Sequence, residues 1–409
     1  MNNHDLSPVK PSQRLVWLDA LRGFALLGIC LANFPEFSLY TFLSPGAAAA
    51  MPTADEDGVV RFLLYMLVYG KFYTLFSLLF GIGFSIIIAN AKKRGDSGFG
   101  LFYRRMGVLA AMGMLHLMFI WSGDILLLYA LLGMLLPLFR RVSDRALLVW
   151  AGVLLAMPVV VDAACQLAGV QLSRPFVEWQ WECCARYGIT EDNFAYWLRD
   201  ADSYGEVFQF LLQGALVRAQ EFIDGNRYFK VLGLFLIGLY IGRRKIVADI
   251  ASHRAWLAKV CRAGLAIGLP LSAVYAWDAM HGRPLGTAGH SVLYLASVYP
   301  LGFAYASGLC LLWLRHGRSH VWGWLAAPGR MALSSYIGQS VIGVLVFYGI
   351  GLRLGASLGL AQTEAVVVAV YLFQIVACRV WLHYFQFGPL EWAWRMLTYG
   401  KYFRIMRRK

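Results

Sequence analysis

The chain alternates long apolar segments with short polar ones along almost its whole length. A transmembrane helix needs about 20 mostly apolar residues, with about 17 to 25 as the usual range, and on this rule we expect about ten spans. They are predicted at residues 15–34, within 59–90, and at 106–121, 125–139, 146–168, 228–241, 256–277, 290–314, 332–350 and 365–383. The expected fold is therefore all-α, a polytopic membrane helix bundle forming a single transmembrane domain over residues 1–409.

Three segments depart from this simple pattern. The apolar run 59–90 is too long for one perpendicular helix, and Gly70-Lys71 is predicted to divide it into an interfacial helix and the second span. Residues 169–227 are mixed in charge with an amphipathic patch at 207–217, which predicts an extracytoplasmic loop containing an amphipathic helix. Residues 385–409 are expected to form a cytoplasmic, interfacial tail.

Composition supports the membrane assignment. Hydrophobic residues make up 59% of the chain and charged residues 15%, whereas roughly a quarter of a soluble domain is charged. The net charge of +14 comes from short basic clusters between apolar spans rather than from one polar face, so we expect no nucleic-acid partner. The lipid bilayer is the expected partner, and a homodimer is compatible with the sequence.

The basic clusters also predict the orientation of the chain. Cytoplasmic loops of membrane proteins carry an excess of Lys and Arg. The clusters fall on alternate loops, which predicts that both termini are cytoplasmic and that 169–227 lies outside. The clusters are Lys92 to Arg94 with Arg104 and Arg105, then Arg140, Arg141 and Arg145, then Arg243 to Lys245, then Arg315 and Arg318, and the tail Arg404, Arg407, Arg408 and Lys409.

The seven cysteines are scattered, and no CxxC or Cys/His spacing indicates a metal site. Cys183 and Cys184 are adjacent in the long polar segment, where a vicinal disulfide or a plain thiol pair would both fit, and the thiol pair is favoured.

The segment "MLHLMFIWSGDILLLYALLGMLL" holds two ionisable residues, His116 and Asp124. His116 follows Arg105 by eleven residues, which at about 1.5 Å per residue puts it about 16 Å into the bilayer. It could act as a general base or proton relay, or be a core histidine bonded to a neighbouring helix. Asp124 occupies an N-cap position, and capping alone could explain it. If the hairpin folds back, Asp124 could also orient His116.

The first predicted span holds a second polar group. Asp19 and Arg22 are three residues apart, share a helix face, and could form a structural pair or a functional one. Asn33 precedes Pro35 and could satisfy backbone groups at the helix end or face a site.

Two further polar sets lie late in the chain. "GRMALSSYIGQSVIG" carries Arg330, Tyr336 and Gln339, and polar residues in such a span are often contacts between helices. "FGPLEWAWRMLTYGK" places Glu391 and Arg395 four residues apart in a segment typical of an interfacial helix. No HExxH, GxSxG, Walker or GxGxxG motif occurs.

Five segments together resemble the YeiB-like family of bacterial inner-membrane proteins, and they span nearly the whole chain. They are "LDALRGFALLGICLAN", "GKFYTLFSLLFGIGFSI", "LHLMFIWSGDILLLYALLG", "GRMALSSYIGQSVIG" and "FGPLEWAWRMLTYGK". This resemblance implies a multi-pass protein of the bacterial inner membrane.

Two of these elements are also similar to those of a wider group of transmembrane acyltransferases that includes heparan-alpha-glucosaminide N-acetyltransferase. The matching residues are Asp19, Arg22, Gly23 and Asn33 in the first element and Gly329, Arg330 and Tyr336 in the late one. The resemblance implies transfer of an acetyl group from cytosolic acetyl-CoA to an acceptor across the membrane. The histidine that follows the first helix in that group is absent between Glu36 and Gly58 here, so His116 would have to replace it, or the reaction differs.

Two hypotheses follow. In the first, an acyl-CoA co-substrate binds at a cytoplasmic mouth through Asp19, Arg22, Arg330, Tyr336, Glu391 and Arg395, and an extracytoplasmic glycan or small-molecule acceptor is acylated. His116 would be the base, Asp124 its orienting acid, and Asn33 or Gln339 the oxyanion donor. In the second, the protein is a proton-coupled transporter or exporter in which His116 and Asp124 relay protons.

Overall fold

The computed structural model describes residues 15–93 and 98–407, and this part of the chain is helical apart from its connections and one isolated bridge between Phe385 and Met406. The long helices are α1 (Val16–Phe37), α4 (Lys71–Lys93), α5 (Phe99–Phe119), α7 (Asp144–Ala168), α11 (Tyr204–Asp224), α12 (Arg227–Arg243), α13 (Arg254–Met280), α14 (Gly286–His316), α16 (Ala332–Phe347) and α17 (Leu360–Tyr384). The shorter ones are α2 (Pro45–Ala49), α3 (Ala54–Leu63), α6 (Leu126–Gly133), α8 (Arg174–Tyr187), α9 (Glu191–Phe194), α10 (Trp197–Asp200), α15 (His320–Arg330) and α18 (Pro389–Tyr399).

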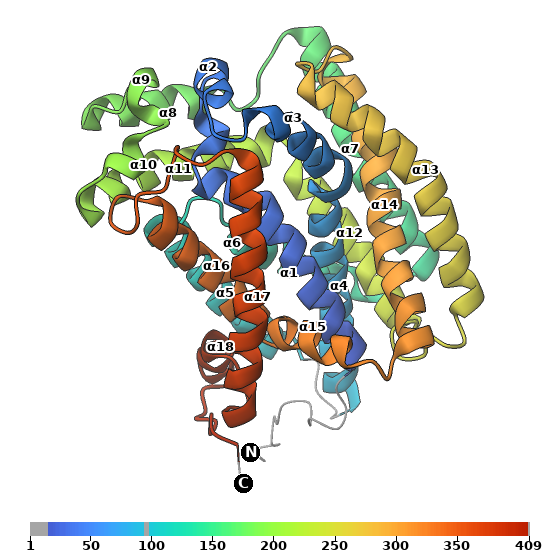
Figure 1. The fold of residues 1–409 in the computed structure, drawn as a ribbon. Helices are drawn as coiled ribbons and strands as arrows, with labels where there is room; N and C mark the ends of the chain where they lie inside the picture. Colours follow the sequence, from blue (N-terminus) through green and yellow to red (C-terminus); the bar gives the residue numbers. More distant parts are fainter. Residues whose placement is uncertain (1–14, 94–97, 408–409) are drawn as a thin grey trace.

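Apart from α11, the long helices run between two ends of the molecule (Figure 1). We call one the α11 end, where α2 and α8 to α11 gather, and the other the α18 end, where α15 and α18 lie. Helices α13 and α14 pack along each other at one side, and α1 crosses the middle beside α15, α16 and α17.

Six helical segments of the described chain are long and apolar enough to cross a membrane, judged by length and composition. A seventh is obtained if α15 and α16, which meet at a bend of 77°, count as one broken span. All ten predicted segments contain helix, so the helical membrane-type fold is confirmed, but the count of ten spans is not.

The number of spans is lower than predicted because some of the predicted segments form short or broken helices. Residues 125–139 do not form one helix: α6 ends at Gly133, and a 3-10 helix follows over Leu136–Arg141 with Pro137 in its first turn. Proline has no backbone N–H to continue the α-helical ladder. The predicted break at Gly70 is present, since Gly70 has φ +82° between a π-helical turn (Leu64–Val68) and α4.

Helix α12 packs against both α4 and α7 and buries residues such as Val231, Leu234 and Phe235. Small residues permit this contact. A Cβ at Gly81 would lie 2.1 Å from the carbonyl oxygen of Phe235, and one at Gly238 would lie 2.2 Å from that of Leu78. Such close backbone approach is typical of helix pairs in lipid, where packing rather than the hydrophobic effect drives association.

Two of the quoted sequence segments meet in the same way. A Cβ at Gly23 of α1 would lie 1.8 Å from the carbonyl oxygen of Leu325, and a Cβ at Gly329 would lie 1.8 Å from that of Asp19. The "LDALRG" and "GR" elements are therefore the two sides of one backbone-to-backbone contact between α1 and α15.

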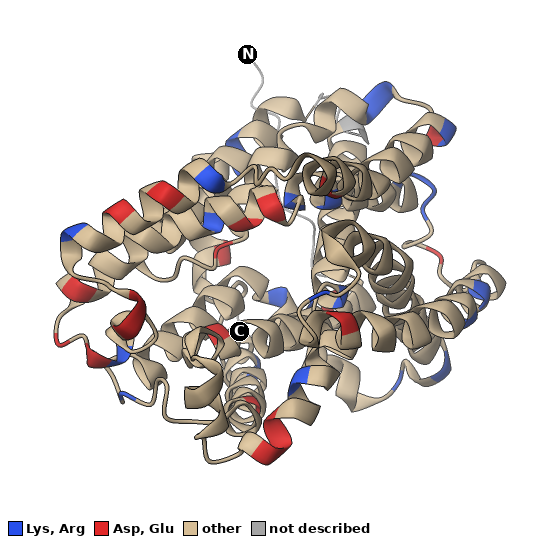
Figure 2. Cartoon of the chain, turned by 90° about the horizontal axis from the view of Figure 1, so that it is seen from above, with Lys and Arg blue, Asp and Glu red and all other residues tan. Residues whose placement is uncertain are grey.

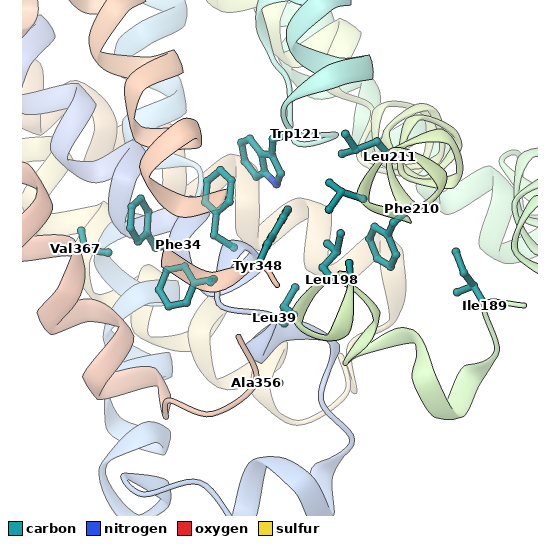
Figure 3. Packing of buried hydrophobic residues seen from close by; sticks show 14 of the residues in the cluster. Phe34, Leu39, Trp121, Ile189, Leu198, Phe210, Leu211, Tyr348, Ala356 and Val367 are labelled. Atoms are coloured by element: carbon teal, nitrogen blue, oxygen red, sulfur yellow. The ribbon is translucent and has the colours of Figure 1, made fainter. Parts of the chain in front are cut away.

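The segment 169–227, expected as a loop with one amphipathic helix, is folded into the four helices α8 to α11. These pack on the α11 ends of α1, α16 and α17 through a continuous apolar cluster that includes Phe34, Trp121, Phe210 and Tyr348 (Figure 3). Within this segment Cys183 and Cys184 are both free thiols, as the sequence favoured, and burial raises the pKa of Cys184 to about 11.

Charge is distributed unevenly between the two ends. Acidic positions outnumber basic ones on α8 to α11, seen at the left of Figure 2. At the α18 end, Arg105 packs on Trp394 of α18, and Arg243 donates to the carbonyls of Phe139 and Val142. Of the predicted basic clusters, Arg94, Arg408 and Lys409 lie outside the described residues, as do the side chains of Lys92 and Lys93.

Candidate functional site

His116 and Asp124 form a buried pair. Nδ1 of His116 lies 2.9 Å from Oδ1 of Asp124, and each residue is 1% exposed. The other carboxylate oxygen, Oδ2, accepts the backbone N–H of Leu127 at 2.7 Å. Because an ionised carboxylate can only accept, Nδ1 carries the hydrogen and Nε2 is left as the basic nitrogen.

This geometry combines two roles that the sequence had left open for Asp124. The carboxylate caps the start of α6 and also orients His116. Asp124 lies at the turn of the hairpin between α5 and α6 and is buried there, because α11 covers the turn: Arg218 donates to the carbonyl of Ser122 at 2.8 Å. His116 itself lies in the last turn of α5.

Ser340 of α16 completes a chain of three. Its Oγ lies 2.9 Å from Nε2 of His116, so serine, histidine and aspartate are linked in that order by hydrogen bonds. This is the arrangement in which a histidine can take a proton from a hydroxyl while a carboxylate stabilises the resulting imidazolium. Ser340 could not be predicted as a partner of His116, because 224 residues separate the two and no local motif joins them.

A cavity of about 1390 Å³ adjoins this triad. Leu333 and Trp394 line it towards the α18 end, and Arg218, Lys230 and Arg283 line it towards the α11 end. A space of this size exceeds a usual small-molecule pocket of about 300 to 1,000 Å³. The cavity therefore extends along much of the distance between the two ends.

Tyr336 and Gly123 form the wall between the cavity and His116. Both line the cavity, and the Tyr336 hydroxyl donates to the carbonyl of Gly123 at 3.4 Å. The Tyr336 ring centroid is 5.2 Å from that of His116, and neither His116 nor Ser340 is among the lining residues. His116, which is 1% exposed, therefore packs beside the cavity-lining Tyr336 without itself lining the cavity.

An ionic network closes the α11 side of the site. Arg218 bonds Glu221, approaches Glu36 at 3.8 Å and holds the Ser122 carbonyl, while Arg227 bonds Glu221 at 3.1 Å. Burial acts to raise the pKa of Glu221, but the charges of Arg218 and Arg227 outweigh it, so this pKa lies below its usual value. Glu221 is therefore a charged, structural partner that fixes Arg218 over the hairpin loop.

Of the predicted cofactor-binding residues, Tyr336 lines the cavity, whereas Asp19, Arg22, Arg330, Glu391 and Arg395 do not. Arg22 bonds Asp19 at 2.6 Å, as the spacing predicted. Arg105 lies within electrostatic range of Arg22 and Arg395. Neither Arg22, Arg330 nor Arg395 lines the cavity, although Leu333 and Trp394, their close neighbours in the chain, do.

Glu391 has a local structural role. It accepts the backbone N–H groups of Leu333 and Ser334 at 2.7 and 3.1 Å, so α18 caps the start of α16. Burial raises its pKa above the ordinary value, although hydrogen bonds from Ser334 and Leu333 act in the opposite direction. The cap holds α16, and with it Tyr336 and Ser340, in register.

The two candidate oxyanion donors differ. Asn33 lines the cavity. Gln339 is buried and its amide N–H donates to Gln374 at 2.9 Å, while Gln374 donates to the Ser335 carbonyl, so Gln339 joins α16 to α17. No group of three or more His, Cys, Asp or Glu side chains within residues 15–93 and 98–407 is arranged to hold a metal ion.

Fold and site define a helical protein of the membrane type with a buried Ser-His-Asp chain beside an internal cavity. The family model described as "Protein of unknown function (DUF418)" matches residues 241–401. An uncharacterized 39.9 kDa protein in the amylase 3' region of Bacillus acidopullulyticus is 31% identical over 408 residues, covering 99% of both chains.

Two further relatives are similar over nearly their whole length. The uncharacterized protein YxaH of Bacillus subtilis is 28% identical over 403 residues, covering 96% of each chain. The uncharacterized protein YeiB of Escherichia coli is 28% identical over 415 residues, covering 94% of this chain and 96% of its own. The chain belongs to the YeiB-like, DUF418 family. No solved structure matches it.

Proposed function

We propose that this protein is a membrane-embedded acyltransferase that passes an acyl group from a cytoplasmic acyl-CoA to an extracytoplasmic acceptor. The observation that carries the proposal is the hydrogen-bonded chain Asp124–His116–Ser340 behind the wall of a cavity that extends towards both ends of the molecule. Asp124 fixes the tautomer of His116, which leaves Nε2 able to accept a proton.

His116 acts as the general base in this mechanism. When Tyr336 turns aside, Nε2 takes the proton of an acceptor hydroxyl or amine, directly or through the Ser340 hydroxyl. The acceptor oxygen or nitrogen bonds to the thioester carbonyl carbon, the carbon–sulfur bond breaks, and the thiolate of coenzyme A leaves and takes up the proton from His116. Asn33 lines the cavity, and its side-chain amide is the remaining candidate to donate a hydrogen bond to the developing oxyanion.

The positive charge at the α18 end supports the proposal that the acyl donor binds there. The guanidinium group of Arg105 lies within electrostatic range of those of Arg22 and Arg395 and packs on the ring of the cavity-lining Trp394. Arginine suits phosphate groups because its planar fork binds them in a bidentate manner. The basic loops at this end favour a cytoplasmic location, in the bacterial inner membrane.

Labelled acetyl-CoA and purified protein in membranes test the proposal. Wild type should release coenzyme A and transfer the label to an acceptor, and His116→Ala should lower the rate at least about a hundredfold, the usual contribution of general base catalysis. His320→Ala removes an exposed histidine and should leave the rate unchanged. Wild-type protein that neither binds acetyl-CoA nor transfers the label to any glycan or small-molecule acceptor would contradict the proposal.

Proton-coupled transport is a second candidate, favoured by one observation. Both carboxyl oxygens of Glu364 in α17 are buried, with no hydrogen-bond partner among the described residues. Unpaired acids inside membrane helices often mark proton pathways. A Glu364→Gln variant that abolished proton uptake by loaded proteoliposomes, in protein without acyltransferase activity, would favour transport over transfer.

A further inference from the structure

One part of the cavity, bordered by α12, α13 and α14, has a surplus of positive charge. We call it the α12–α14 lobe and define it by the cavity-lining residues Lys230, Tyr275, Arg283, His290 and Tyr294. None of these residues belongs to the Ser-His-Asp chain or to the basic cluster at the α18 end.

Every carboxylate that lines the cavity is already engaged by protein groups. Asp162 accepts from Asn226 at 2.7 Å and from Ser291, and Asp224 accepts from Ser173 at 2.6 Å. Glu221 is held by Arg218 and Arg227, and Glu36 faces Arg218. The acids of the cavity therefore have internal partners and do not call for an external cation.

The cations are not balanced in the same way. Within residues 15–93 and 98–407, neither Lys230 nor Arg283 has a carboxylate within 4.0 Å. The ammonium of Lys230 lies 3.9 Å from the ring centroid of Tyr294; the charge of Asp162 attracts it, and the charges of Arg227 and Arg283 repel it. Asp162 has only neutral hydrogen-bond partners and offsets one of the two charges of Lys230 and Arg283. A ring face compensates an ammonium group only in part, so one positive charge is left available to a ligand.

His290 adds a donor or acceptor to the same lobe. Its Nδ1 lies 2.8 Å from Oδ2 of Asp278, a fully buried carboxylate that also accepts the backbone N–H of Leu285. Asp278 thus orients the ring, whose centroid is 4.8 Å from that of Tyr275. Nε2, on the opposite side of the imidazole ring, is not used by Asp278.

A second amine, that of Lys71, lies next to Tyr275 of the lobe. Lys71 is fully buried, donates to the carbonyl of Tyr65 at 2.7 Å and lies 5.0 Å from the ring centroid of Tyr275. It has no carboxylate within 4.0 Å in the described part of the chain. When protonated, it adds to the positive potential of the lobe.

From these contacts we infer that the α12–α14 lobe binds the phosphate group of a phosphate ester. Lys230, Arg283, the Tyr294 hydroxyl and His290 come from three different elements and surround one volume, so they suit a group with several acceptor oxygens on different sides. A phosphate offers three or four such oxygens, whereas a carboxylate offers two in one plane. A neutral sugar would leave the cations uncompensated.

The rest of the cavity indicates where such a ligand extends. From the lobe, Tyr73, Phe76 and Tyr129 continue the lining towards Gly123 and Tyr336, the wall in front of His116. A phosphate held by Lys230 would leave the remainder of the molecule directed along this aromatic path. That this phosphate ester is the acceptor of acyl transfer rests on the proposed function. That it binds in the α12–α14 lobe does not.

The test is ligand binding by the purified full-length protein in a non-ionic detergent, measured by thermal stabilisation without any acyl donor. Glycerol 3-phosphate represents a soluble phosphate ester and dioctanoyl phosphatidic acid a lipid one, with glycerol and dioctanoylglycerol as phosphate-free partners. We expect at least one phosphate ester, and neither phosphate-free compound, to stabilise wild type in a concentration-dependent manner. The ester that binds identifies the source of the phosphate.

Matched variants locate the site. Lys230→Gln and Arg283→Gln should each weaken the binding about tenfold, as expected when one charge-assisted contact to phosphate is lost. Lys259→Gln removes an exposed lysine of α13 and should leave binding unchanged. The inference is overturned if neither ester stabilises wild type, if the phosphate-free compounds do so equally, or if Lys230→Gln and Arg283→Gln bind as well as wild type. Because no acyl-CoA is present, binding here is independent of whether acyl transfer is found.

Discussion

At the scale of single residues, the central feature is that His116 has a partner on each ring nitrogen although it is 1% exposed. Buried polar groups are costly unless they are hydrogen-bonded, and the full cost appears when one partner is removed. The Asp124 carboxylate serves two such groups at once, the imidazole and the Leu127 N–H. Removal of this carboxylate should therefore lower the free energy of unfolding as well as the rate of the proposed reaction.

Asp124→Ala should lower the free energy of unfolding by about 1 to 3 kcal/mol for each donor left unsatisfied. Asp124→Asn should cost less, because an amide oxygen can still accept the Leu127 N–H. Thermal or denaturant unfolding of the purified protein in detergent measures both. Asp55→Ala, at an exposed position of α3, serves as the control and should be near neutral. Equal stability of Asp124→Ala and wild type would mean that the His116–Asp124 bond does not form.

At the scale of helices, glycines decide which pairs can approach closely. The contact between α1 and α15 places Gly23 and Gly329 against backbone atoms rather than against flexible side chains. A backbone carbonyl cannot move aside without displacing its whole helix, so each glycine is required by the packing.

Gly23→Ala and Gly329→Ala should each be strongly destabilising, because the new Cβ would lie 1.8 Å from a carbonyl oxygen. Overpacking of this kind costs typically about 1 to 3 kcal/mol and sometimes more. Gly152→Ala in α7 is the matched control, since nothing lies within 4 Å of a Cβ there, and it should be neutral or stabilising by up to about 1 kcal/mol. Unfolding temperatures that fall equally for all three variants would refute the proposed contact.

At the scale of the whole molecule, the two ends differ in charge and in architecture. Helices α8 to α11 form an acidic end that packs on the bundle through the cluster of Figure 3, while basic residues mark the α18 end. The positive-inside tendency then predicts that the α11 end is extracytoplasmic.

Cys183 provides a test of this orientation. It is a free, partly exposed thiol on α8, whereas its neighbour Cys184 is buried and burial raises the pKa of that thiol to about 11. A membrane-impermeant maleimide should label wild-type protein in right-side-out vesicles, and Cys183→Ser should remove that label. Labelling of Cys183 only after the vesicles are opened would show the reverse orientation.

Much of this molecule could be read from its sequence, for local reasons. Runs of apolar residues fixed the class of protein and located a helix in every predicted segment, because burial in lipid depends on composition over a window of neighbours. The Asp19–Arg22 pair, the capping role of Asp124 and the break at Gly70 also depend on short-range spacing or on one residue type.

Only the tertiary structure decided which distant groups meet. Ser340 reaches His116 across 224 residues, and Arg218 covers the hairpin from a segment expected to be a loop with one amphipathic helix. Lys230 packs on the Tyr294 ring, and in the described part of the chain the charge of Asp162 from another helix reaches it only from beyond 4.0 Å. Side-chain convergence depends on how helices pack, and in an apolar environment many helix arrangements satisfy the same hydrophobic pattern. The sequence by itself therefore determined that this chain folds as membrane-type helices, and their packing decided what lies between them.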